Sequence, residues 1–376
     1  MRDEPSDSST SGAQPTGPAQ PSQTSRASLP PLVDADALGR YLAQTLPGPD
    51  DGAPLQVERI RGGHSNETFF ITRGRDQWAL RRPPRGPLLP TAHDVGREYR
   101  VLRGLERTNV PIPRPILFCD DASVIGAPFY LMERVHGVVI RAALPAAFQA
   151  DVAARAGLGY AVIDTLADLH AVDWQAVGLA DLGKPQGYLE RQLRRWTGQL
   201  DASRNRPLPD LDAVTAWLQA HLPESPAATV VHGDYRLDNL MFAPEPPARA
   251  VAVLDWEMAT LGDPLADVGY LLSFWREPGD PDFGALGDAA WNITAQPGFP
   301  SRAQLVERYA ARTGRQMDHV NFYVALAIWK LAILLEGSYK RHLSGTTDDP
   351  FFATLGEGIP MLARRALVVC EGTAGV

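Results

Sequence analysis

The 376-residue sequence predicts an α+β fold with two lobes, in which a small antiparallel β lobe precedes a large, mainly helical lobe. Short stretches between 55 and 82 are rich in alternating, β-branched or aromatic residues, which is typical of strands. After Gly137, apolar residues recur mainly at the spacing of helices. With 44% hydrophobic and 21% charged residues, the chain has the composition of a globular protein and can bury a sizeable core.

The first 30 residues differ in composition from the rest of the chain. Residues 1–30 are rich in Ser, Pro, Thr, Gln and Gly, so they cannot offset their ordering entropy and are predicted to be a disordered tail. A transit peptide is the weaker alternative, because several acidic residues lie near the start. Helical spacing begins in 31–46. The first lobe is therefore predicted to cover 31–135 and the second lobe 136–376.

The first lobe is expected to hold a nucleotide-binding sheet and one helix. Strands are predicted at 55–60, 67–73, 77–82, the end of the proline-rich segment 110–119, and 129–135. The sequence RGRD at 73–76 is expected to form the turn of a hairpin. Between the third and fourth strands, 94–109 repeats apolar residues on one helical face.

The second lobe is predicted to be mainly helical. Helices are expected at 145–172, 186–201, 211–222, 301–313 and 318–342. Two β segments interrupt them, one inside 230–242 and one at 250–256. The longest apolar stretch, 322–335, contains Lys330 and is too short to span a bilayer, so it predicts a buried helix and no membrane partner.

Charge and cysteine content exclude several classes of protein. A net charge of −8 and a pI near 5.5 argue against a nucleic-acid binder, although a local basic site could still bind a small anion. Cys119 and Cys370 show neither zinc-site spacing nor a disulfide framework. No secretory hydrophobic region follows Met1. We therefore expect a cytoplasmic protein.

Five polar side chains interrupt the apolar run VVHGDYRLDNLMF at 230–242, where their burial costs free energy unless each finds a partner. Asp234 and Asn239 lie five positions apart, and Asp255 follows Asn239 by 16. An amide oxygen and a carboxylate suit Mg²⁺, Asp234 could accept a proton from an attacking hydroxyl, and Arg236 could clamp a phosphoryl group. Each residue alone is readily explained as a turn residue. As a set, Asp-x4-Asn followed by a strand-end Asp is the layout of the protein-kinase catalytic loop and metal aspartate.

The motifs HGDYRLDN and LDWE resemble those of the aminoglycoside phosphotransferase family, a branch of the protein-kinase-like fold, over about residues 55–345. The resemblance implies that Asp234 orients or deprotonates the acceptor hydroxyl. It also implies that Asn239 and Asp255 bind Mg²⁺ and that ATP is the phosphoryl donor. His232 would brace the loop and Asp267 would cap a helix. Asp238 is expected to make only local hydrogen bonds.

By the same resemblance, the first lobe should hold the nucleotide. Gly63, Ser65 and Asn66 fall in the loop expected to cover the phosphates, although two glycines there also fit a plain hairpin. Arg81 stands where the family more often has Lys, and Glu98 on the following helix is its expected partner. A lone Glu on an amphipathic helix is otherwise usually solvated.

Adenine is expected on the strand that joins the lobes. Met132 would line the back of the pocket, and the backbones of Glu133 and Val135 would bind the base. A buried strand needs no ligand, so this assignment depends on its place in the fold.

Three longer stretches, 81–102, 298–315 and 323–341, resemble the kinase-like domain fused to some eukaryotic acyl-CoA dehydrogenases. The resemblance implies phosphorylation of a hydroxyl group, of a 4-hydroxyacyl-CoA above all, and a functional link to an acyl-CoA dehydrogenase. The late helices combine aromatic residues with the cations Lys330, Lys340 and Arg341, which suits an anionic, partly apolar acceptor, although such aromatic spacing is also typical of a core. The alternatives are an aminoglycoside or other antibiotic phosphotransferase, and a non-catalytic nucleotide-binding pseudokinase. A metal hydrolase using His232 is weaker, because no second His has ligand spacing.

Overall fold

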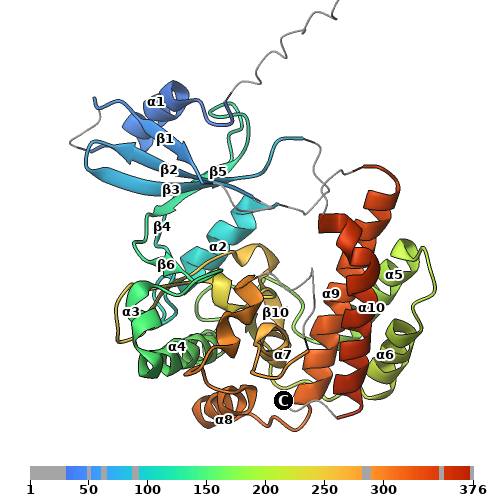
Figure 1. Ribbon diagram of the computed structural model, residues 1–376. Coiled ribbons are helices and arrows are strands. Elements are labelled where there is room, and N and C mark those ends of the chain that lie inside the picture. Colours follow the sequence, from blue (N-terminus) through green and yellow to red (C-terminus); the bar gives the residue numbers. More distant parts are fainter. Residues whose placement is uncertain are drawn as a thin grey trace, which may run out of the picture. The chain divides into compact units, whose positions relative to one another are not determined.

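A five-stranded antiparallel sheet forms the first lobe, as the sequence predicts (Figure 1). Its strands lie in the order β1-β2-β3-β5-β4. They are β1 (Gln56–Arg59), β2 (Glu67–Arg73), β3 (Asp76–Arg82), β4 (Pro115–Cys119) and β5 (Phe129–Glu133). The RGRD turn is confirmed: Arg73 pairs with Asp76, and Gly74 takes the positive φ of 57° that closes a two-residue hairpin.

The computed structural model describes residues 31–48, 52–60, 66–86, 93–281, 289–346 and 351–372. The chain divides into Met1–Leu32 and Val33–Val376, and every element named below belongs to the second unit. The predicted tail at 1–30 lies outside the described residues, as do Gly63 and Ser65 of the predicted phosphate loop.

Two capped helices flank the sheet. Helix α1 (Ala35–Thr45) begins at Asp34, whose side chain accepts a hydrogen bond from the Ala37 N–H at 2.9 Å. Helix α2 (Val95–Leu105) begins at Asp94 in the same way and packs against β4 and β5. The buried face of α2 carries Glu98 among apolar side chains, which brings a carboxylate beneath the sheet.

The second lobe contains eight described helices and two short sheets. The helices are α3 (Ala146–Ala150), α4 (Val152–His170), α5 (Tyr188–Ser203), α6 (Pro209–Ala220), α7 (Leu265–Phe274), α8 (Arg302–Thr313), α9 (Val320–Leu343) and α10 (Phe351–Cys370). One sheet is β6 (Val138–Val139), β8 (Leu240–Phe242) and β9 (Ala250–Val253); the other is β7 (Thr229–Val231) and β10 (Thr260–Gly262). Short 3₁₀ turns cover Leu237–Asn239 and Trp256–Met258.

The helix predicted at 145–172 is two helices. Asp151 has an extended backbone that ends α3, and its side chain caps α4 by accepting the Ala154 N–H at 3.1 Å. Helix α10 was not predicted, because Pro360 and neighbouring glycines hide its periodicity. In the fold, α10 packs along α9 and α6 (Figure 1).

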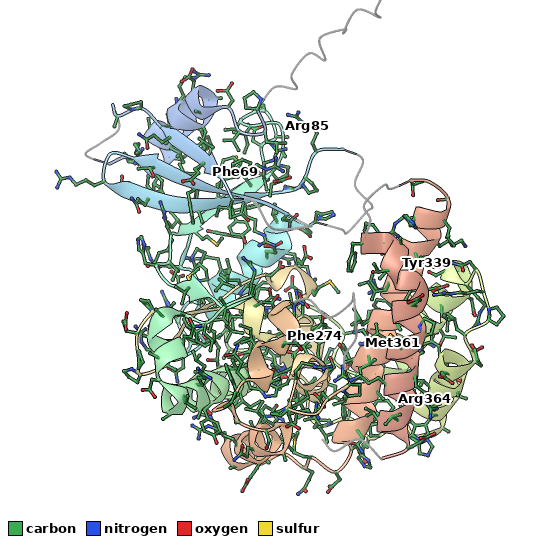
Figure 2. All side chains as sticks on the ribbon, viewed as in Figure 1. Phe69, Arg85, Phe274, Tyr339, Met361 and Arg364 are labelled. Atoms are coloured by element: carbon green, nitrogen blue, oxygen red, sulfur yellow. The ribbon has the colours of Figure 1, made fainter. Side chains whose placement is uncertain are left out.

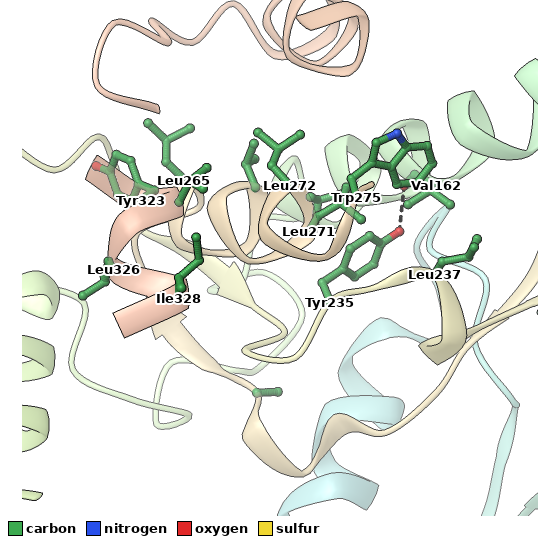
Figure 3. Close-up of a cluster of buried hydrophobic side chains, with 14 of the residues drawn as sticks. Val162, Tyr235, Leu237, Leu265, Leu271, Leu272, Trp275, Tyr323, Leu326 and Ile328 are labelled. Atoms are coloured by element: carbon green, nitrogen blue, oxygen red, sulfur yellow. Dashed lines mark hydrogen bonds between the residues drawn. The ribbon is translucent and has the colours of Figure 1, made fainter. Parts of the chain in front are cut away.

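Helix α9 is the buried core helix that the sequence predicts. By length and composition it could cross a membrane, but 61% of its most apolar stretch is buried inside this fold. Figure 3 shows Tyr323, Leu326 and Ile328 of α9 in the same apolar cluster as Leu265 of α7. The two helices approach closely at Gly269, where a Cβ atom would lie 2.4 Å from the backbone carbonyl carbon of Tyr323.

Candidate active site

A sharp turn after β7 places the loop that carries Asp234. Gly233 has a φ of 85°, and a Cβ atom there would lie 2.8 Å from the Met258 carbonyl oxygen. Only glycine fits this turn without strain. His232 is fully buried, and its Nε2 lies 2.9 Å from the Leu254 carbonyl oxygen while its Nδ1 accepts the Asp234 N–H at 3.2 Å. His232 therefore braces the loop, as predicted.

Asp267 holds the same loop through two backbone N–H groups and does not cap a helix. Its two carboxylate oxygens accept the backbone N–H groups of His232 at 2.7 Å and Gly233 at 2.8 Å. The capping role predicted for Asp267 is wrong, because α7 starts before it with Pro264 at the N-cap and its side chain points to the loop. Burial lowers the pKa of His170, so a neutral imidazole contributes a third contact to Asp267, at 3.3 Å from Nε2.

Asn239 and Asp234 are in direct contact. The Asn239 Nδ2 group donates to the backbone oxygen of Asp234 at 2.7 Å and to its Oδ2 at 2.8 Å. This orientation turns the amide oxygen of Asn239 away from Asp234, and none of the described residues donates a hydrogen bond to that oxygen. It is thus left as a possible cation ligand.

Asp255 reaches the same region from the adjacent hairpin. Leu240 of β8 pairs with Val253 of β9, so Asn239, one residue before Leu240, and Asp255, two residues after Val253, lie at one end of the hairpin. Asp255 adopts a left-handed backbone with φ 66°, which is uncommon outside glycine and costs conformational energy. The described residues contain no cluster of three His, Cys, Asp or Glu side chains, so a metal here would depend on one amide and one carboxylate plus phosphate oxygens.

Arg81 bridges two carboxylates that are far apart in sequence. Its Nε lies 2.9 Å from Glu98 Oε2, and its Nη2 donates to Asp255 Oδ1 at 2.5 Å. The predicted Arg81–Glu98 pair is therefore present, and Asp255 is an additional partner. Burial lowers the pKa of Arg81, but the two carboxylates outweigh it and raise the pKa above its ordinary value. Arg81 thus stays charged beside the predicted metal ligand.

Glu98 sits in a buried polar cluster. Tyr130 donates its hydroxyl to Glu98 Oε2 at 2.9 Å, and the Asn66 amide donates to Oε1. Burial raises the pKa of Glu98 to about 7 against the opposing effect of Arg81. The amide of Asn66, predicted to be a donor in the phosphate loop, is buried, and its oxygen faces His93 Nδ1 at 3.2 Å. Asn66 instead positions Glu98.

Arg236 is held by the acidic residues on either side of it. Its Nε lies 3.1 Å from Asp238 Oδ1 and 3.7 Å from Asp234 Oδ1, and its guanidinium covers the ring of Phe274 at 5.2 Å. Figure 2 labels Phe274 near the middle of the second lobe. Asp238 thus forms an ion pair with Arg236, whereas the sequence predicts only local hydrogen bonds for it.

The strand expected to bind adenine, β5, lies between β3 and β4 in the sheet. Met132 is buried in β5 opposite Ala79 of β3. Glu133 pairs with Trp78 of β3, and its N–H donates to the Arg114 carbonyl oxygen at 2.8 Å. Within the described part of the chain, the backbone of Val135 makes no backbone hydrogen bond. The backbone of Val135 is therefore open to a ligand, and the adenine contacts of Met132, Glu133 and Val135 stay predictions.

The sequence does not predict the position of Tyr270 at the site, and it predicts Lys330 only as one of three acceptor cations. Tyr270 of α7 lies within hydrogen-bonding reach of Asp234, and burial raises the pKa of its hydroxyl well above 10, so it remains a donor. Its position one helical turn after Asp267 was the available signal. Lys330 of α9 lines a small cavity with Gly233 and Tyr270. The other two predicted acceptor cations, Lys340 and Arg341, instead bond to Ala202 and Ser338.

The aromatic residues of α9 belong mainly to the core, which is the other interpretation their spacing allowed. Phe322, Tyr323 and Trp329 are buried. The hydroxyl of Tyr323 donates to Asp263 at 2.8 Å, and the indole of Trp329 donates to Thr215 at 2.8 Å. These side chains therefore stabilise the lobe, and Lys330 is the charged residue of α9 that lines the cavity beside Gly233.

Comparison with known proteins agrees with this geometry. The sequence pattern described as "Phosphotransferase enzyme family" matches residues 56–305. The protein from Rattus norvegicus named "Acyl-CoA dehydrogenase family member 11" is 38% identical over 347 residues, which cover 89% of this chain and 44% of that protein. The chain thus spans less than half the length of the curated relatives it matches.

Solved structures show the same fold. A protein from Ralstonia eutropha JMP134, named provisionally as an aminoglycoside phosphotransferase, has a TM-score of 0.76 and 35% identity, covering 90% of this chain and 98% of that one. A thermostable mutant of aminoglycoside phosphotransferase APH(4)-Ia, in a ternary complex with AMP-PNP and hygromycin B, has a TM-score of 0.57 at 15% identity, covering 91% of this chain and 100% of that one. The second likeness concerns the fold alone, and together they confirm the predicted α+β class.

Proposed function

This chain belongs to the phosphotransferase enzyme family, and from that premise we propose that it is an ATP- and magnesium-dependent kinase acting on a hydroxyl group of a small molecule. One observation carries the proposal: Asp234, Asn239 and Asp255 lie on two loops that are tied together by backbone and side-chain hydrogen bonds. A scaffold that only bound nucleotide would not need a carboxylate held so firmly beside the metal-ligand pair.

Each of the three residues has a chemical role that fits its environment. Asp234 accepts the proton of the acceptor hydroxyl, and Asn239 and Tyr270 keep its carboxylate oriented. The free amide oxygen of Asn239 and the carboxylate of Asp255 fit a magnesium ion, which would neutralise phosphate charge when bound. Transfer forms a bond between the acceptor oxygen and the γ-phosphorus and breaks the bond to the bridging oxygen, so ADP leaves and the proton passes to Asp234.

We further propose that the acceptor is a hydroxyacyl-CoA, with a 4-hydroxyacyl-CoA as the leading candidate. The curated relatives are named acyl-CoA dehydrogenases, and this chain aligns with only part of them, so a functional link to a dehydrogenase belongs to the same proposal. An aminoglycoside is less suitable as an acceptor, because Glu336 is buried in a pair with Arg206 at 3.2 Å and Glu307 is exposed on α8. Neither lines the cavity beside Gly233 and so neither could bind a polycation there.

The test is phosphate transfer from ATP by the purified protein, with 4-hydroxyacyl-CoA and hygromycin B offered as acceptors. Transfer to the acyl-CoA is expected. Asp234→Asn should abolish it, while a thermal-shift titration with MgATP still reports nucleotide binding. The matched control is Asp181→Asn, which removes an exposed carboxylate paired with Arg100 and should keep activity. Transfer to hygromycin B alone would overturn the acyl-CoA assignment, and binding of MgATP with no transfer to any acceptor would favour a pseudokinase.

A further inference from the structure

Lys330 occupies an unusual position for a lysine. It lies on the core helix α9, is half-buried, and lines a small cavity together with Gly233 of the catalytic loop, Tyr270 of α7 and Tyr188 of α5. Its ammonium lies 5.5 Å from the centre of the Trp196 ring. The side chain therefore reaches from the core helix to the loop that carries Asp234.

No counter-ion neutralises this ammonium within the described part of the chain, where no carboxylate lies within 4.0 Å of it. The nearest acids are Asp267 and Asp234. Asp267 is already occupied by two backbone N–H groups and a histidine, and Asp234 is bonded to Asn239. Burying an ammonium without a partner costs free energy, so the position calls for an anion or a carbonyl oxygen from outside.

The neighbouring charges strengthen this requirement. Arg195, exposed on α5, is close enough to lower the pKa of Lys330, and it makes no ion pair with any residue that the structure describes. The other ionisable groups that face Lys330 are the acids already named and the hydroxyls of Tyr188, Tyr270 and Tyr323, whose raised pKa keeps them neutral. Lys330 therefore has a second cation close to it.

Lys330 and Arg195 lie on other elements than the residues predicted to bind the nucleotide and the metal. Lys330 and Arg195 lie on α9 and α5, whereas Arg81 lies on β3 and the metal-ligand pair flanks the β8–β9 hairpin. The cavity at Lys330 also excludes the phosphate-facing residues, since its lining comes from α5, α7, α9 and Gly233. The acceptor, which must approach Asp234 opposite the nucleotide, would meet Lys330.

We propose that Lys330 is the residue that recognises the acceptor, by binding the thioester carbonyl oxygen of a hydroxyacyl-CoA while Arg195 meets the anionic part of the same molecule. This inference rests on the proposed kinase function. It restricts the acceptor to hydroxy compounds that carry a carbonyl oxygen and negative charge, and it excludes polycations such as aminoglycosides. Lys330 is then a specificity-determining residue, whereas Asp234 is the catalytic one.

The experiment compares Lys330→Met with the wild type and with Lys340→Met, the same change at an exposed position of the same helix. For 4-hydroxyacyl-CoA, Lys330→Met should raise KM at least about tenfold, while KM for ATP and kcat change less than about twofold. Lys330→Arg should partly restore KM. Burial lowers the pKa of Lys330 to about 8. At pH values above 8, the acceptor KM of the wild type should therefore increase, and Lys330→Met should show no such increase.

A binding measurement separates this inference from the kinase proposal. Butyryl-CoA lacks the hydroxyl and cannot be phosphorylated, so calorimetry reports acceptor binding whether or not turnover occurs. Wild type and Lys340→Met should bind it, and Lys330→Met should bind it at least about tenfold more weakly. Equal binding by Lys330→Met and wild type, or an unchanged acceptor KM, would overturn the role of Lys330 and leave the kinase function standing. If the wild type shows no turnover but Lys330→Met still binds butyryl-CoA more weakly, the kinase proposal fails and the role of Lys330 in binding stands.

Discussion

An acceptor-binding cation that has no counter-ion in the free protein should make the fold less stable. Burial lowers the pKa of Lys330 from 10.5 to about 8. Each pH unit corresponds to about 1.4 kcal/mol, so holding the ammonium in place costs the folded state about 3 kcal/mol at neutral pH. Lys330→Met keeps the length of the side chain and its contact with Trp196 but removes the charge. It should therefore raise the free energy of unfolding by about 3 kcal/mol at pH 7.

The gain in stability from Lys330→Met should depend on pH. The pKa of Lys330 is lower in the folded than in the unfolded protein, so the penalty is complete below pH 8 and disappears as the pH rises towards 10.5. The stability difference between Lys330→Met and wild type should fall to about 1 kcal/mol at pH 9.5. For a unit of this size the gain at pH 7 corresponds to a rise in Tm of about 4 °C.

Urea denaturation at pH 7, 8 and 9.5 measures the difference directly. Lys340→Met is the control, because its ammonium is exposed and its removal should change stability by less than about 0.5 kcal/mol. A gain that is the same at all three pH values would show that packing, and not charge burial, explains it. A loss of stability in Lys330→Met at pH 7 would refute the argument altogether.

Four further changes test the rest of the site. Arg81→Met should lower the free energy of unfolding by about 3 kcal/mol at pH 8, where the charged Glu98 loses its counter-ion. The loss should be smaller at pH 5.5, because burial raises the pKa of Glu98 to about 7 and the carboxyl is then protonated. Equal losses at both pH values would contradict the ion pair. Tyr270→Phe should lower kcat several-fold at unchanged KM for ATP, and an unchanged kcat would remove its role at Asp234. Asp267→Asn should cost about 2 kcal/mol in urea denaturation, since two charge-assisted hydrogen bonds to the loop are weakened. Gly269→Ala should cost about 2 kcal/mol because its methyl group would collide with the α9 backbone; a neutral result would mean that α7 and α9 separate easily.

Local pattern was enough for most of the first lobe. Alternating residues predict the hairpin of β2 and β3, because successive side chains in a strand face opposite sides and a two-residue turn sets the register. The pattern was misleading where a local break did not match the tertiary arrangement. Asp151 caps a new helix inside an apparently continuous one, and Pro360 lies within a helix that packing against α9 stabilises.

The sequence by itself determined which residues carry the proposed chemistry on the catalytic loop. Asp234 and Asn239 are only five positions apart, so the short loop that joins β7 to β8 brings them together in almost any arrangement of the lobe. Asp255 joins them because a hairpin pairs β8 with β9. Spacing of this kind is local, and local geometry can be inferred from the chain alone.

Only the tertiary structure decided what surrounds that loop. Arg81 meets Asp255 across 174 positions, Asp267 turns away from its own helix end to hold the loop, and Lys330 reaches the loop from the core helix. Each contact depends on how helices and strands pack, since packing fixes the direction and burial of side chains that no sequence spacing relates. Burial also sets the free-energy cost of an unpaired charge, which is why the same lysine that interrupts an apolar run in the sequence becomes, in the fold, the proposed binding site for the acceptor.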